Sequence, residues 1–115
     1  MAKRLCIAIA VSKPDGLEEV PGAIPSATRL ADWAGGQGYD VALVTDKPDP
    51  VTCARLADIF HEKLGAGGQE RVIIAFAGHG LIRGGAEEYW LLSGWRTRAT
   101  EAVNYLKLRE RLSTY

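Results

Sequence analysis

The chain has little cysteine, no excess of charge of either sign and no long apolar run. Its 115 residues include only two cysteines, Cys6 and Cys53, which excludes a disulfide framework and leaves no CxxC motif for a metal or redox centre. Fourteen Lys and Arg balance fourteen Asp and Glu, so no electrostatic argument favours nucleic acid or a membrane surface as the main partner. The apolar run at residues 5–11 is far shorter than the roughly 18 residues of a membrane span, and no signal-peptide cleavage site follows it. We therefore expect a reduced, cytoplasmic protein.

The composition is that of one folded domain. Hydrophobic residues make up 47% and charged residues 24% of the chain, fractions that exclude a disordered polymer. Three short runs, at residues 5–11, 41–45 and 72–77, are apolar at consecutive positions, which is typical of strands buried on both faces of a parallel sheet. Two stretches of helical periodicity lie between them. The resulting β-α-β-α-β order predicts an α/β fold with right-handed crossovers.

Capping residues and apolar stripes place the helices. Ser26 is expected to cap the first helix and Thr52 the second. The stripes expected to face the sheet are Ala27, Leu30, Ala31 and Ala34 in the first helix, and Leu56, Ile59, Phe60 and Leu64 in the second. Residues 88–92 predict a strand of a short hairpin, and residues 104–112 a last amphipathic helix. Such a thin sheet has an exposed edge, so residues 1–115 are expected to be the first part of a single domain.

The most informative segment follows the third apolar run. It reads Phe76-Ala77-Gly78-His79-Gly80 and places a histidine between two glycines at the carboxyl end of a buried strand. Ligands and reacting groups of parallel α/β sheets gather at that end. His79 can serve there as a general base, and the backbone N–H of Gly80 can donate to an oxyanion. The residues by themselves fit an ordinary loop histidine equally well.

The same segment resembles the catalytic-histidine motif of the caspase-like cysteine peptidases, the superfamily of caspases, metacaspases and their bacterial relatives. Four further segments resemble that fold in the same order. Residues 5–11 (LCIAIAV) are similar to its first strand, residues 20–24 (VPGAI) to its L-x-G-A segment, residues 38–46 (GYDVALVTD) to its second strand, and residues 51–52 to the start of its second helix. The resemblance covers essentially the whole chain.

The resemblance implies a caspase-like three-layer α-β-α sandwich with a mixed six-stranded sheet. This chain would supply the first three parallel strands, a short hairpin and three helices. It also implies cysteine endopeptidase activity on protein or peptide substrates, with His79 as general base of a Cys–His dyad and Gly80 at the oxyanion hole. The nucleophile of such enzymes follows the histidine by about 50 residues, which lies beyond Tyr115. This chain alone is therefore expected to be inactive and to need the remaining part of the domain or a partner chain.

The resemblance also points to a loop that would approach the S1 pocket. That loop contains Asp15, Glu18 and Glu19, and acidic residues there would favour Lys or Arg at P1; a solvated acidic loop is the alternative. Pro25-Ser26 stands where the family commonly has Asn-Asp, so the calcium response of the family does not carry over through that motif. The residues themselves indicate no cofactor and no metal site, and calcium enters only through the resemblance.

Neither cysteine of the chain is expected to replace the missing nucleophile. Cys6 lies inside the first predicted strand, where a free cysteine behaves as a small apolar residue. Cys53 lies in the first turn of the second predicted helix, where a helix N-terminus can lower the pKa of a thiol. No expected element brings that turn to His79, so packing is the preferred interpretation for both thiols.

The remaining aromatic and histidine side chains are assigned to packing and to the surface. Trp33, Trp90 and Trp95 fall in separate elements and are expected to fill core or hairpin contacts, with a substrate groove as the alternative for Trp90 and Trp95. His61 has no second ligand at metal-site spacing and is expected to lie at the surface of its helix.

Two other functions stay open at this point. A non-catalytic caspase-like module would bind a protein partner, or a second copy of itself, through its open sheet edge. An α/β hydrolase or nucleotide-binding domain unrelated to caspases is the third hypothesis. Against it, the sequence has neither a G-x-S-x-G elbow nor a phosphate-binding loop.

Overall fold

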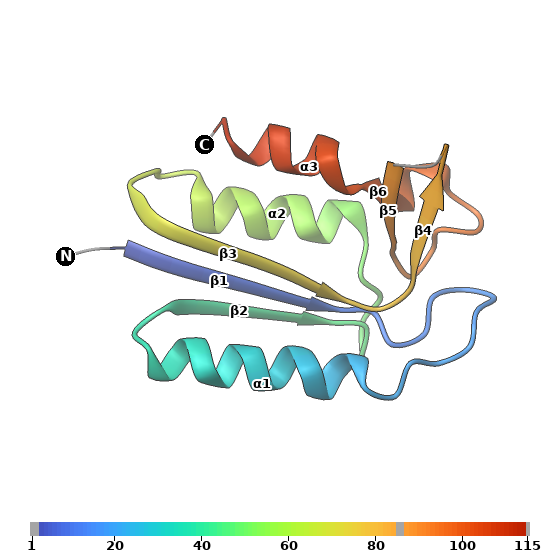
Figure 1. The fold of residues 1–115 in the computed structure, drawn as a ribbon, viewed down its shortest axis with the longest axis horizontal. Coiled ribbons are helices and arrows are strands. Elements are labelled where there is room, and N and C mark those ends of the chain that lie inside the picture. Colours follow the sequence, from blue (N-terminus) through green and yellow to red (C-terminus); the bar gives the residue numbers. More distant parts are fainter. Residues whose placement is uncertain (1–2, 85–86, 115) are drawn as a thin grey trace.

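The computed structural model describes residues 3–84 and 87–114 (Figure 1). Along the chain these residues form β1 (Lys3–Ala10), α1 (Ala23–Gly36), β2 (Asp40–Thr45), α2 (Cys53–Leu64), β3 (Gln69–Ala77), β4 (Gly80–Arg83), β5 (Glu87–Leu91), the 3-10 helix η1 (Ala99–Glu101), β6 (Ala102–Asn104) and α3 (Tyr105–Leu112).

The first sheet is parallel and has the strand order β2-β1-β3. All three strands coincide with the apolar runs of the sequence, and the predicted α/β class with three parallel strands and three helices is confirmed. Strand β3 pairs with β1 on one side; on its other side it has no neighbouring strand among the residues that the structure describes. The carboxyl ends of the three strands point the same way, toward the second sheet (Figure 1).

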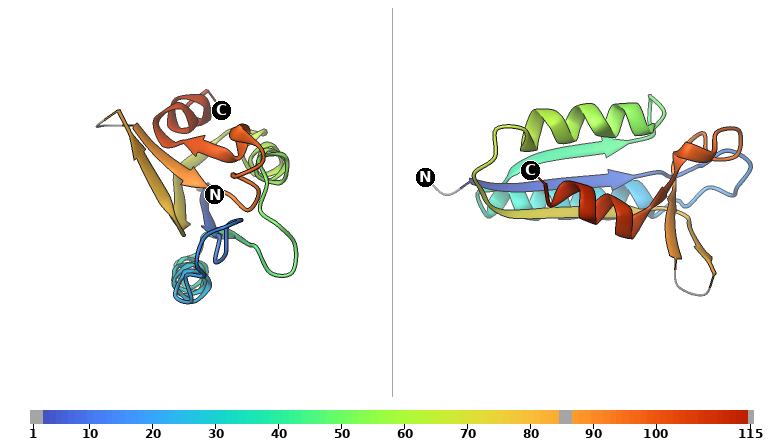
Figure 2. Two further views of the ribbon diagram at one scale, coloured as in Figure 1. Left: turned by 90° about the vertical axis from the view of Figure 1, so that its right-hand side faces the viewer. Right: turned by 90° about the horizontal axis from the view of Figure 1, so that it is seen from above.

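The central strand β1 alternates between large and small side chains, and this alternation decides which helix covers each face. The large residues, which pack with α2 and α3, are Leu5, Ile7, Ile9 and Val11. The small residues, which pack with α1, are Cys6, Ala8 and Ala10. The buried face of α1 consists of Ala23, Ala27, Ala31 and Ala34. Small residues on both surfaces let α1 lie close to the sheet, on the face opposite α2 and α3 (Figure 2).

The start of α1 differs from the prediction. The helix begins at Ala23 with Gly22 at the N-cap position, and no side chain caps it. Ser26 lies inside the first turn, where its N–H donates to the Gly22 carbonyl, so its prediction as N-cap was wrong. The physical reason is Pro25, whose missing N–H costs nothing in a first turn and lets the helix begin earlier.

The N-termini of α2 and α3 are both capped by side chains, and that of α2 by the predicted residue. The Thr52 hydroxyl accepts a hydrogen bond from the Arg55 N–H at the start of α2. The Asn104 side chain accepts one from the Lys107 N–H at the start of α3. Both stretches predicted from helical periodicity are therefore helices, and in each the apolar stripe packs toward the core.

A second, antiparallel sheet, β4-β5-β6, follows the third parallel strand. Its first two strands form the predicted hairpin, whereas β6 is only three residues long and gave no pattern in the sequence. Trp90 of β5 lies opposite Val103 of β6 and stacks on Phe76 of β3, with 4.9 Å between ring centroids. These contacts hold the small sheet against the end of the large one. Within residues 3–84 and 87–114, no helix combines the length and the apolar character that crossing a membrane requires.

Candidate functional site

Three polar side chains follow the three parallel strands at their carboxyl ends. Ser12 comes shortly after β1, Asp46 directly after β2, and His79 shortly after β3. The Val11 N–H donates to the Ala77 carbonyl at 2.9 Å, which continues the β1–β3 pairing up to the point where the chain turns toward His79. Parallel α/β sheets carry their sites at this edge. We therefore take this edge as the candidate site.

Gly78 allows the close approach that brings His79 to this edge. Its φ is 157°, and a Cβ at this position would lie 2.8 Å from the Val11 carbonyl oxygen and 3.0 Å from the Phe76 ring. Only a residue without a side chain fits against that carbonyl. The glycine before the histidine is thus required by packing as well as by backbone conformation.

The imidazole of His79 is half-buried and is held by one ring nitrogen. Its Nε2 lies 2.8 Å from the backbone carbonyl oxygen of Glu18, in the loop between β1 and α1. A carbonyl oxygen can only accept a hydrogen bond, so Nε2 carries the proton. In the neutral ring the lone pair then lies on Nδ1. This contact therefore leaves Nδ1 as the ring nitrogen that can accept a proton.

The backbone N–H of Gly80 points away from β5. The Leu91 N–H donates to the His79 carbonyl at 3.1 Å, and Gly80 lies opposite Trp90 in the ladder. Hydrogen-bonded and non-hydrogen-bonded pairs alternate along antiparallel strands, which makes Gly80 and Trp90 a non-hydrogen-bonded pair. The N–H of Gly80 is therefore directed out of the hairpin, and it belongs to the residue that directly follows His79.

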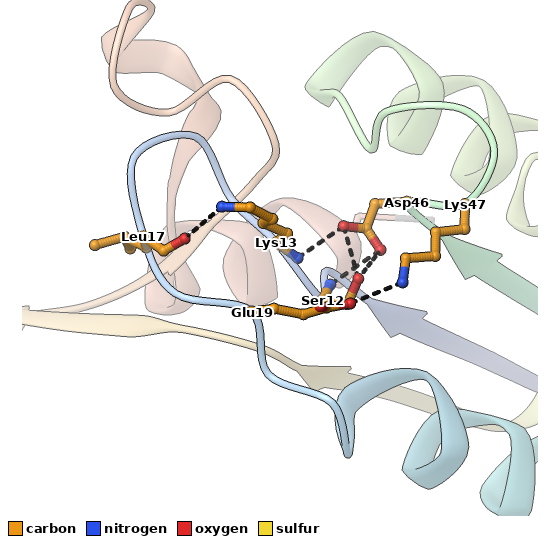
Figure 3. A network of polar contacts seen from close by, with 6 residues as sticks. All are labelled: Ser12, Lys13, Leu17, Glu19, Asp46 and Lys47. Carbon is orange, nitrogen blue, oxygen red and sulfur yellow. Dashed lines mark hydrogen bonds and ion pairs between the residues drawn. The ribbon is translucent and has the colours of Figure 1, made fainter.

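A polar network fixes the loop that carries Glu18 (Figure 3). The Asp46 carboxylate accepts hydrogen bonds from the Ser12 N–H, the Ser12 hydroxyl and the Lys13 N–H, each at 2.9 Å. Lys47 forms an ion pair with Glu19 at 2.8 Å, and the Lys13 ammonium donates to the Leu17 carbonyl. Burial raises the pKa of Asp46, but the bonds from Ser12 and Lys13 outweigh it, and the net pKa lies below 3.8.

The sequence analysis did not single out Ser12 or Asp46. A signal for them exists, because each is among the first polar residues after neighbouring parallel strands. Both belong to the support of the site rather than to its reacting groups, since the Asp46 oxygens are occupied by backbone and hydroxyl donors.

Replacing Asp46 by asparagine is expected to lower the free energy of unfolding by about 1–2 kcal/mol at pH 7. The amide nitrogen of asparagine cannot accept from the Lys13 N–H, which then loses its partner. Because the folded-state pKa is lowered, the stabilisation by the carboxylate is complete above 3.8 and is lost as pH falls through the folded value. Urea unfolding of wild type and variant at pH 7 and pH 2.5 measures both effects.

The matched control for this measurement is Asp32→Asn, on the exposed side of α1. It should unfold like the wild type at both pH values. An Asp46→Asn variant with wild-type stability at pH 7, or with an undiminished deficit at pH 2.5, contradicts the assignment of this network as the support of the loop.

Asp15 lies in the same loop, three residues before Glu18. Its side chain is exposed, while its backbone is held on both sides: its N–H donates to the Ser93 carbonyl, and its carbonyl accepts from the Trp95 indole N–H, both at 2.9 Å. Of the three acidic residues of the loop, Glu19 is paired with Lys47, which leaves Asp15 and Glu18 as exposed carboxylates outside any ion pair among the described residues.

Neither cysteine of the described chain is a candidate nucleophile. Cys6 is completely buried, and burial raises the pKa of its thiol. The Cys53 thiol donates to the Thr100 carbonyl, and burial together with the hydrogen bond and charge of Glu101 raises its pKa to about 12. The preferred packing role of Cys53 agrees with its place against the core. The helix N-terminus does not lower the pKa of its thiol, because the Glu101 carboxylate occupies that N-terminus by accepting from the Cys53 N–H at 2.7 Å.

Two apolar cavities lie away from His79. One, of about 260 Å³, opens between α2 and α3, and the other, of about 200 Å³, between β3 and α3; Leu108 and Leu112 line both.

The predicted packing role is confirmed for Trp90 and wrong for Trp33, whose side chain is 53% exposed on α1. His61 is exposed, as expected. Within the described ranges, no three His, Cys, Asp or Glu side chains are grouped to hold a metal ion.

No protein-family model matches the chain, and no curated protein matches it. The functional interpretation therefore depends on the geometry of the site and on the sequence motifs themselves.

Proposed function

We propose that this chain is the N-terminal part of a caspase-like cysteine peptidase domain, with His79 as the general base. The observation that carries the proposal is the hydrogen bond between Nε2 of His79 and the Glu18 carbonyl at the carboxyl end of the parallel sheet. It fixes the tautomer and leaves Nδ1 free to accept a proton, which is what activation of a thiol requires. The motif around His79 supplies the second line of support.

In the proposed reaction, Nδ1 of His79 takes the proton of a cysteine thiol, and the thiolate attacks the scissile carbonyl carbon. The N–H of Gly80 donates to the oxyanion that forms. The imidazolium then gives its proton to the leaving amine, and water hydrolyses the thioester that remains. The thiol belongs to a segment about 50 residues after His79, outside residues 1–115.

The free edge of β3 is the place where such a segment would join the sheet. β3 pairs with β1 on one side, and the described chain offers no strand on the other. Val72, on this edge, is 40% exposed although it is part of an apolar run. In the proposed complete domain a further strand covers this edge and extends the sheet toward the six strands of the caspase-like sandwich.

The proposed substrate is a peptide with Lys or Arg at P1. The exposed carboxylate of Asp15 lies in the loop that contacts His79, and Glu18 adds a second exposed carboxylate. Assays with and without Ca²⁺ belong to the proposal, because calcium enters through the resemblance of the chain to metacaspases.

The test is covalent labelling of the native protein with a peptide-based thiol electrophile, followed by mapping of the modified residue. We expect a single adduct on a cysteine outside residues 1–115, because both Cys6 and Cys53 are protonated and engaged. An adduct on Cys6 or Cys53, or modification of no cysteine under conditions in which the protein is folded, overturns the proposal.

The open edge of β3 also favours a second function, that of a non-catalytic caspase-like module. A partner chain would add a strand to β3 through main-chain hydrogen bonds, with its apolar side chains against Val72 and Ile74. The same labelling experiment separates the two functions. A native protein without a reactive thiol favours the binding module.

A further inference from the structure

The loop between β1 and α1, residues 11–22, holds the His79 ring by a hydrogen bond to a backbone atom. No side chain of the loop holds the ring; the Glu18 carbonyl does. The position of that carbonyl depends on how the loop is held. The Val20 N–H donates to the Ser12 carbonyl at 2.6 Å and closes the base of the loop, on the side where Asp46 binds Ser12 and Lys13.

The far side of the loop is held by the segment 92–98, which follows β5. This segment is itself firmly anchored: Leu92 is completely buried, the Ser93 N–H donates to the Val51 carbonyl at 3.1 Å, and the Val51 N–H donates to the Ser93 hydroxyl at 2.9 Å. Two hydrogen bonds connect it to Asp15, one at the Ser93 carbonyl and one from the Trp95 indole N–H.

We infer that Trp95 is a positioning residue for His79, acting through the loop. Its indole N–H fixes the Asp15 carbonyl, a Leu17 N–H to Pro14 carbonyl bond at 3.1 Å closes the turn that follows, and Glu18 comes next. Without the indole N–H, the Asp15 carbonyl loses its partner and the segment carrying Glu18 is free to shift away from the imidazole. The Nε2 proton of His79 is then exposed to water.

That His79 acts as a base rests on the proposed function. The positioning of its ring by Trp95 can be measured in the folded protein without any peptidase activity. The readout is the ring N–H proton of His79 in NMR spectra at pH 8.5, where an ordinary imidazole is neutral. A hydrogen-bonded ring N–H exchanges slowly enough to be observed. The chain has only one other histidine, the exposed His61, so the assignment is direct.

The wild-type chain is expected to show a slowly exchanging Nε2 proton for His79. In Trp95→Phe, which keeps the ring and removes only the donor, exchange should become at least about tenfold faster, in line with the loss of one hydrogen bond. Gly16→Ala is the second variant: Gly16 has φ +78°, a conformation that L side chains rarely adopt, so alanine strains the loop two residues before Glu18 while the Trp95 indole donor is kept.

Trp33→Phe is the matched control, because Trp33 is 53% exposed on α1, and it should leave the exchange rate unchanged. Wild-type exchange in Trp95→Phe overturns the positioning role, whatever the rate in Gly16→Ala, which calibrates how the exchange responds to a displaced loop. Faster exchange in Trp95→Phe supports the positioning role by itself. If the native protein also has no reactive thiol, that second result contradicts the peptidase and leaves the positioning role standing.

Discussion

Replacement of His79 by alanine in the native protein is expected to lower kcat/KM for peptide cleavage by about 10²–10⁴-fold, the usual contribution of a positioned general base. The variant removes the Nδ1 atom proposed to accept the thiol proton, and the side-chain hydrogen bond lost with the ring is the one from Nε2 to the Glu18 carbonyl in a loop, outside the sheet. Steady-state cleavage of a peptide with Lys or Arg at P1 measures the effect.

His61→Ala is the control for this experiment. The only other histidine of the chain lies exposed on α2, and its removal should leave kcat/KM within a factor of two or so of the wild type. Equal activity of wild type and His79→Ala contradicts the assignment of His79 as the base.

Replacement of Gly78 by alanine is expected to destabilise the protein by about 1–3 kcal/mol. The added Cβ would lie 2.8 Å from the Val11 carbonyl oxygen, a backbone atom that cannot move without disturbing the buried strand β1. The chain has to relax by displacing the turn that carries His79, so the variant should also lose the Nε2 hydrogen bond to Glu18.

Gly80→Ala is the matched comparison, two residues further along the same turn. There an added Cβ meets only the Tyr89 carbonyl oxygen at 3.5 Å, an ordinary contact distance, and its φ lies outside the positive region. Urea unfolding should give a midpoint close to wild type for Gly80→Ala and a clearly lower midpoint for Gly78→Ala. Equal midpoints contradict the close packing of Gly78 on Val11.

The parts of the fold that follow from local pattern were predictable. Consecutive apolar residues marked the three parallel strands, and Thr52 marked the start of α2, because burial on both faces and capping leave their signature in neighbouring residues. The place of His79 at a strand end followed from the same pattern. The start of α1 was missed because the sequence shows a good capping residue, Ser26, within a helix that begins three residues earlier.

The features that were missed depend on residues far apart in the sequence. Asp46 binds Ser12 across 34 positions, and Glu18 binds His79 across 61. The raised pKa of Cys53 had no signal in the sequence, because Glu101, which caps the same helix end, lies 48 residues away. The contact that sets the His79 tautomer is made by a backbone carbonyl, a group that every residue has. The sequence therefore gives no sign of it, and it could be found only in the structure.

The most direct test of the central claim, that His79 activates a thiol, compares the rate of thiol modification in the native protein with that in His79→Ala. With the peptide electrophile at pH 7, the second-order rate constant should fall by about 100-fold or more in the variant, because the thiol then lacks the base that removes its proton. The modified cysteine should lie outside residues 1–115 in both proteins. Equal rate constants, with the same cysteine modified, would show that the thiol reacts independently of His79 and would contradict the account.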